Sequence, residues 1–200
     1  TFYTGHRITF DDLSTQSGGK LVSMTIVAAI TLLASVYFFG IKKHPLGWKA
    51  VGVRAVAPLW VLSSFIVGIL FLPVSVFISD VVSNIMIDSG LDFETAAETF
   101  DTFPTWEFIG VFITVAIIVP IVEEIFFRGV LFNWLRYRHS LMVGLVVSSL
   151  LFGAIHLAYV SLISLSLVGM LCALVYERSG SIWTAVAVHA GNNGALVIYF

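Results

Sequence analysis

Three ionisable residues lie within six positions of an otherwise apolar run, and they constrain this chain more than any other feature. The run covers residues 108–135 and contains Glu123, Glu124 and Arg128. An ionisable side chain at the centre of a membrane helix costs about 2.5–3.5 kcal/mol on insertion scales, so such residues usually serve a function. The segment therefore predicts a functional site in an apolar environment.

The spacing of these residues separates the two glutamates. On a helix, Glu124 and Arg128 are four residues apart and share a face, with the acid on the N-terminal side, which is the more favourable order for an ion pair. Glu123 points about 100° away, and the residue four positions after it is Phe127, which cannot form an ion pair. We therefore expect Glu124 to be paired structurally and Glu123 to be available for chemistry.

The composition places the chain among polytopic helical membrane proteins. Of its 200 residues, 58% are hydrophobic and 11% are charged, against about 25% charged residues in average soluble domains. The formal net charge of −2 shows no excess of basic residues of the kind that binds nucleic acid. The single cysteine, Cys172, excludes an intrachain disulfide and a multi-cysteine metal site, and we expect it to be a small buried apolar residue.

Apolar segments long enough to cross a bilayer predict an all-α membrane bundle of about six transmembrane helices. We expect one integral-membrane domain over residues 1–200, with the site-bearing core at about 105–200. Pro58 and Pro73 predict kinks, or a start and a break, in the second span. In chain order, the expected spans are residues 21–40, 55–79, 108–135, 141–158, 160–176 and 182–200.

Charge alternates between the segments that join these spans. Basic residues follow the first, third and fifth spans, whereas residues 80–107 hold seven acids and no Lys or Arg. The positive-inside rule predicts that the basic segments face the cytoplasm and that both termini lie outside. We interpret the acidic stretch as a solvated, partly helical cap, with admission of substrate as the alternative.

Two of the five histidines fall inside apolar spans. His156 lies in the fourth, and His189 lies in the sixth, four residues before Asn193 on the same helix face. At about 1.5 Å per residue, Glu123, His156 and His189 lie roughly 15–24 Å from the basic ends of their spans. All three therefore fall within a hydrocarbon core about 30 Å thick and can meet at a similar depth.

These residue types suit hydrolysis. A carboxylate in an apolar site is a stronger base than one in water, so Glu123 could take a proton from water and direct that water at a carbonyl group. His189 and Asn193 could donate hydrogen bonds to the resulting oxyanion, and His156 could position the water or act as a second base. Pro120, just before the acids, removes one helix hydrogen bond and could open room for water.

A metal-dependent reading stays open beside this one. Glu123, His156 and His189 form the donor set of some catalytic zinc sites, although the chain has no His-Glu-x-x-His helix. We favour the metal-free glutamate reading, so no cofactor is predicted and zinc is the alternative.

Three motifs resemble those of the CAAX prenyl protease (type II) and bacteriocin-processing family, also called the Abi family. They are Glu123-Glu124-x-x-x-Arg128, Phe152-x-x-x-His156 and His189-x-x-x-Asn193, in that order, and residues 48–54 resemble a short basic element found upstream in bacterial members. The resemblance covers about residues 105–195. It implies an intramembrane endopeptidase with Glu123 as general base and the other motif residues completing the site, namely Glu124, Arg128, His156, His189 and Asn193.

The resemblance also implies a membrane-anchored or lipidated, CAAX-type, peptide substrate that is met in the lipid bilayer. Two readings from other classes stay open: a non-enzymatic membrane protein that binds a peptide or confers immunity, and a proton-coupled transporter that uses Glu123 as its proton site. Loss of cleavage in Glu123→Gln would distinguish the protease from both.

Overall fold

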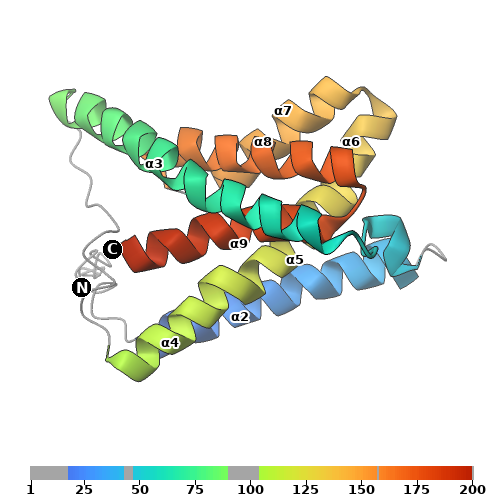
Figure 1. The fold of residues 1–200 in the computed structure, drawn as a ribbon, viewed down its shortest axis with the longest axis horizontal. Coiled ribbons are helices and arrows are strands. Elements are labelled where there is room, and N and C mark those ends of the chain that lie inside the picture. Colours follow the sequence, from blue (N-terminus) through green and yellow to red (C-terminus); the bar gives the residue numbers. More distant parts are fainter. Residues whose placement is uncertain (1–17, 43–46, 90–103, 157, 200) are drawn as a thin grey trace, which may run out of the picture.

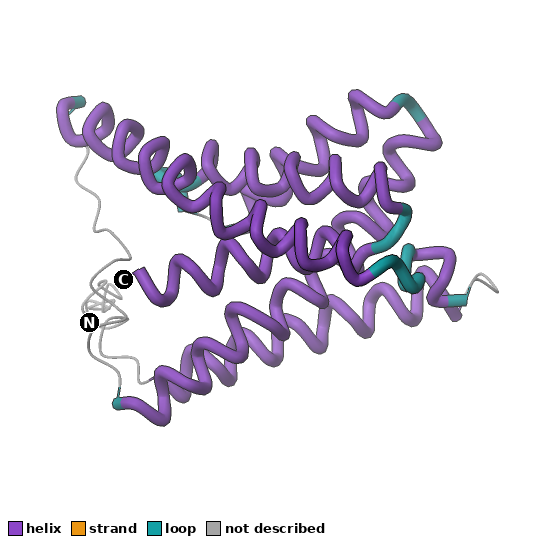
Figure 2. Tube along the Cα trace, in the orientation of Figure 1, coloured by secondary structure: helices purple, strands orange, loops and turns teal. Residues whose placement is uncertain are grey.

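The computed structural model describes residues 18–42, 47–89, 104–156 and 158–199, which form a bundle of helices running back and forth between two ends (Figure 1). Within these ranges the regular structure is entirely helical, with no strand (Figure 2). The elements are α2 Gly18–Ser35, the π-helix η1 Val36–Lys42, the 3-10 helix η2 Trp48–Val51, α3 Pro58–Asp88, α4 Thr105–Ile113, the π-helix η4 Thr114–Ile118, α5 Val119–Phe126, the π-helix η5 Phe127–Phe132, α6 Asn133–Arg138, α7 Leu141–Ile155, α8 Leu162–Ser179 and α9 Ile182–Tyr199.

The predicted membrane bundle is confirmed, and the chain is an integral, multi-pass membrane protein. Among the described residues, four helical stretches are long and apolar enough to cross a membrane: Val22–Lys42, Pro58–Asp88, Thr105–Arg138 and Leu162–Ser179. Helix α7 is apolar but has 15 residues. Helix α9 has 18 residues, and its polar residues His189, Asn192 and Asn193 lower its hydropathy.

The second span is longer than its sequence predicts. Helix α3 begins with Pro58 in its first turn and continues through Pro73 to Asp88. The predicted end at residue 79 is therefore wrong, because apolar residues continue on the helix beyond Asp80. Of the two alternatives at Pro73, the break is wrong and the kink stays a prediction. Residues 90–103, which hold four of the seven acids of the acidic stretch, lie outside the described residues.

The third span is one helical stretch with two irregular segments. The π-helices η4 and η5 flank α5, which carries both glutamates. Pro120 lies in the first turn of α5 and has no N–H to bond a carbonyl of the preceding π-helix. The side chain of Asn193 donates to one of these carbonyls, with 3.1 Å between its Nδ2 and Val115 O. Such π-segments often occur at functional sites.

Helix α9 lies inside the bundle and contacts α3, α5 and α8 (Figure 1). Its packing on α3 depends on two glycines, because an added Cβ at Gly68 would overlap the carbonyl of Val188, and one at Gly191 would overlap the carbonyl of Phe65. Cys172 of α8 is fully buried, as the sequence predicts.

The three basic segments meet at one end of the bundle. The backbone N–H of Ile182 donates to Gly52 O at 2.9 Å, and Arg136 Nη2 lies 2.5 Å from Glu177 Oε1. Gly52 has a φ of 83°, which favours glycine, and a Cβ there would collide with Tyr176. The alternation of charge therefore matches the arrangement of the helices, and the cytoplasmic orientation of this end stays a prediction.

Candidate active site

The inner face of α5 and η5 carries a fully buried ion pair. Arg128 Nη1 donates to Glu124 Oε1 at 2.9 Å, and both side chains are 0% exposed. The other terminal nitrogen of Arg128 donates to the backbone carbonyl of Gly169 in α8, at 2.6 Å. The i, i+4 pair expected from the sequence is present, and it joins the glutamate helix to α8.

The ring of Phe152, on α7, lies among the charged and imidazole groups. Its centroid is 4.7 Å from Arg128 Cζ, 5.3 Å from the His189 ring and 5.1 Å from the His156 ring. A Cβ at Gly169 would lie 3.1 Å from Phe152 Cδ1. The absence of a side chain at Gly169 therefore lets this ring and the Arg128 guanidinium approach α8.

Both histidines are oriented through Nδ1. His189 Nδ1 lies 3.0 Å from Glu124 Oε1, and His156 Nδ1 lies 2.8 Å from the carbonyl oxygen of Phe152. Because a carbonyl and an ion-paired carboxylate accept hydrogen bonds, Nδ1 is the donor in both rings. A neutral imidazole held in this way has a lone pair on Nε2.

Glu123 faces these two Nε2 atoms. Its Oε2 lies 3.9 Å from His156 Nε2 and 4.0 Å from His189 Nε2, and its side chain is 16% exposed. Among the described residues, Glu123 Oε2 is a buried atom with no hydrogen-bond partner. These separations are too long for direct hydrogen bonds, and polar groups this far apart are often joined by a bridging water molecule. Glu123 and the two imidazoles are therefore the groups that could polarise such a water molecule.

The two histidines differ in accessibility. His189 is buried within α9, whereas His156 stands at the C-terminal end of α7 with its side chain 29% exposed. A substrate could therefore reach Glu123 past His156 more readily than past His189.

Asn193 lies one turn beyond His189 but bonds to a backbone carbonyl, whereas the two histidines face Glu123. Its amide donates to Val115 O, so it links α9 to the π-helix that precedes α5. Its neighbour Asn192 is buried and accepts a 3.4 Å hydrogen bond from Ser75. The role of Asn193 as an oxyanion donor stays a prediction.

The described part of the chain contains no group of three or more His, Cys, Asp or Glu side chains that could hold a metal ion. Glu123, His156 and His189 are donors of the type that zinc accepts, and their placement here does not form a ligand set. The metal-free mechanism stays a prediction, with zinc dependence as the alternative that chelation can test.

Sequence reasoning missed two parts of the site because both are backbone groups. The carbonyl of Gly169 accepts from Arg128, and the carbonyl of Val115 accepts from Asn193. A glycine inside an apolar helix signals close packing, so Gly169 could have been singled out. Phe152, which shares a motif with His156, packs against Arg128 and His189 as well as against His156.

The fold and the site define a class of protein: a multi-pass helical membrane protein with carboxylates, imidazoles and an arginine gathered between its helices. Residues 105–195 match the model of the family described as Type II CAAX prenyl endopeptidase Rce1-like, and this segment contains all six predicted site residues. The resemblance stated from the three motifs is therefore confirmed.

Two curated proteins are similar to part of the chain. The "Uncharacterized 24.3 kDa protein" of Escherichia coli is 35% identical over 82 residues, which cover 38% of this chain and 38% of the relative. The "Putative membrane peptidase YdiL" of Bacillus subtilis (strain 168) is 31% identical over 83 residues, which cover 42% of this chain and 34% of the relative. The matches thus span little more than a third of each relative. No solved structure matches the chain.

Proposed function

We propose that this protein is an intramembrane endopeptidase that hydrolyses a peptide bond in a membrane-anchored or prenylated substrate, with water activated by Glu123. The observation that carries the proposal is the position of Glu123 Oε2, 3.9 and 4.0 Å from the Nε2 atoms of His156 and His189. The match to the CAAX endopeptidase family and the name of the B. subtilis relative support the reaction class.

The first step is attack by water. A water molecule between Glu123 and His156 donates one hydrogen to the carboxylate and one to Nε2, and presents its lone pair to the substrate carbonyl. As the new C–O bond forms, Glu123 takes a proton from the water and the carbonyl electrons move onto oxygen. The product of this step is a tetrahedral oxyanion.

His189 can stabilise that oxyanion when Nε2 carries a proton. Its Nδ1–H already bonds to Glu124, which turns Nε2 toward Glu123. Collapse of the oxyanion then breaks the C–N bond, and the proton held by Glu123 passes to the leaving amine.

The test is cleavage of a panel of membrane-anchored and farnesylated CAAX peptides by purified protein in lipid, followed by mass spectrometry. Wild type, Glu123→Gln and a control, Glu177→Gln, are compared with and without a strong chelator. Glu177 pairs with Arg136 at the basic end, away from the site. We expect cleavage by wild type and the control only, and no effect of the chelator.

Four results would contradict the proposal at different points. Cleavage by folded Glu123→Gln would exclude Glu123 as the base. Loss of wild-type cleavage in the chelator, restored by zinc, would replace the metal-free mechanism. No cleavage of any peptide by folded wild type would favour a binding or immunity protein, and pH-gradient-dependent uptake into liposomes would favour a transporter.

A further inference from the structure

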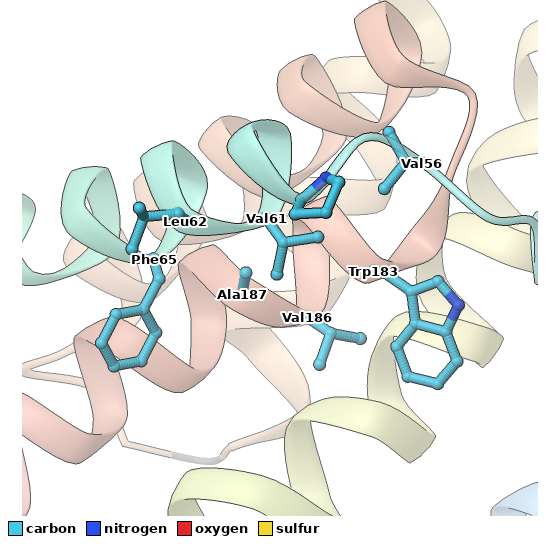
Figure 3. A pocket seen from close by; sticks show the side chains of 8 residues that line it. Val56, Val61, Leu62, Phe65, Trp183, Val186 and Ala187 are labelled. Atoms are coloured by element: carbon cyan, nitrogen blue, oxygen red, sulfur yellow. The ribbon is translucent and has the colours of Figure 1, made fainter.

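An apolar groove lies between the first turns of α3 and α9 (Figure 3). Its volume is about 670 Å³, within the range of about 300–1,000 Å³ usual for small-ligand pockets. The lining residues all have apolar or aromatic side chains; they are Val56, Pro58, Val61, Leu62, Phe65, Trp183, Val186 and Ala187.

The groove opens on the side of the bundle, at the basic end. Trp183, Leu62 and Phe65 line it and are exposed, so its contents would meet the hydrocarbon of the bilayer. Tryptophan is enriched where membrane proteins cross from hydrocarbon to headgroups, which agrees with the place of Trp183 in the first turn of α9. The groove therefore begins near the headgroup level and extends into the hydrocarbon.

The backbone of Arg54 lies at the basic end of this groove. Arg54 is two residues before the lining residue Val56, and Ser181 Oγ donates to the Arg54 carbonyl at 2.6 Å, which holds this segment against the start of α9. The Arg54 side chain is exposed, and its Nε donates to Lys49 O at 2.8 Å. In the described part of the chain, arginine–carboxylate ion pairs form at Arg128 and Arg136 and not at Arg54.

We propose that this groove binds an anionic glycerophospholipid of the surrounding bilayer, with one acyl chain between α3 and α9 and the phosphate at Arg54. Basic pockets between transmembrane helices bind anionic headgroups in this way. A symmetric dimer through the groove would instead bring two Arg54 side chains to one interface, where like charges repel. The site goes beyond the proposed function and does not depend on it.

Quenching of Trp183 fluorescence by brominated lipids tests the proposal. The full protein is placed in phosphatidylcholine bilayers with the same small fraction of either dibrominated phosphatidylglycerol or dibrominated phosphatidylcholine, and Trp183→Phe identifies the signal of Trp183. We expect the anionic lipid to occupy the groove about fivefold more favourably, the factor that corresponds to about 1 kcal/mol for one basic residue near a membrane.

Two matched pairs of variants locate the lipid. Arg54→Gln should abolish the preference for phosphatidylglycerol, whereas Arg138→Gln, which removes a charge from the same end outside the groove, should keep it. Val61→Phe should weaken quenching by filling the groove. Leu70→Phe, at an α3 residue that is 69% exposed and not part of the lining, should not.

Three results would overturn the proposal, and the first two need no variant beyond the Trp183→Phe reference. They are equal quenching by the two brominated lipids, protection of Trp183 from both as expected if a second copy covered the groove, and an unchanged preference in folded Arg54→Gln.

Discussion

The two faces of α5 carry neighbouring glutamates in different surroundings. On the inner face, Glu124 is 0% exposed and one of its oxygens contacts both Arg128 and His189 at 2.9–3.0 Å. On the other face, Glu123 is 16% exposed and its Oε2 stays 3.9–4.0 Å from two imidazoles. Glu124 Oε1 thus accepts from two donors of its own chain, whereas Glu123 Oε2 has no hydrogen-bond partner among the described residues.

This contrast shows how an apolar site can hold two acids with separate tasks. A buried charge is tolerated when it is paired and hydrogen-bonded, and Arg128 does this for Glu124. The resulting rigid group then orients His189 toward Glu123. We therefore assign stability to the inner face and chemistry to the outer face, a division that variants on each face can test.

The largest effect should follow from removing the arginine. Arg128→Met leaves Glu124 buried without its cation, and breaking a buried pair in this way costs about 3–5 kcal/mol of stability. The double variant Glu124→Gln/Arg128→Met should recover part of this loss, because no unpaired charge remains. Thermal or chemical unfolding in a fixed lipid or detergent measures both. If Arg128→Met lowers the stability by less than about 1 kcal/mol, as for an exposed pair, the Glu124–Arg128 pair does not have the structural role assigned to it.

His189 contacts both glutamates, and two amide variants separate its functions. In His189→Asn the amide nitrogen can replace Nδ1 as donor to Glu124, while Nε2 is lost, so cleavage should fall about 10²–10³-fold, as for loss of one oxyanion donor, with little loss of stability. His189→Gln places its amide nearer the Nε2 position and leaves Glu124 without this donor, at a cost of about 1–3 kcal/mol. Equal cleavage by His189→Asn and wild type would remove His189 from the chemistry.

A smaller effect is expected at Gly169. An added Cβ would lie 3.1 Å from Phe152 Cδ1 and 3.3 Å from Arg128 Nη2, and overpacking of this kind costs about 1–3 kcal/mol. The control is Gly110→Ala on α4, where the nearest atom would be 3.8 Å away and alanine should stabilise the helix by about 0.5–1 kcal/mol. If both variants raise the unfolding temperature equally, close packing at Gly169 does not support the site.

The features that could be predicted from the sequence are those that depend on the geometry of a single helix. The Glu124–Arg128 pair follows from i, i+4 spacing, and the common depth of Glu123, His156 and His189 follows from distance along each helix. The structure brings these three side chains together, in agreement with that depth.

What could not be predicted depends on how neighbouring helices are rotated. The contact of Arg128 with Gly169 O joins residues 41 positions apart, and that of Asn193 with Val115 O joins residues 78 positions apart. The π-helices η4 and η5 also change the phase of the side chains on either side of α5, so helix periodicity alone does not give their direction. The end of α3 at Asp88 differs from the predicted one because the acid at Asp80 does not end the helix, and apolar residues continue beyond it.

The most direct test of the division between the two glutamates compares Glu123→Gln with Glu124→Gln in the same lipid, measuring both the cleavage rate and the free energy of unfolding. We predict that Glu123→Gln lowers the rate about 10²–10⁴-fold, the usual contribution of a general base, with unchanged stability. Glu124→Gln should lose about 3–5 kcal/mol of stability, because Arg128 is left buried and unpaired. If Glu123→Gln instead cleaves at the wild-type rate and Glu124→Gln is stable but inactive, the assignment is contradicted. Glu124 would then be the base, and Glu123 would not.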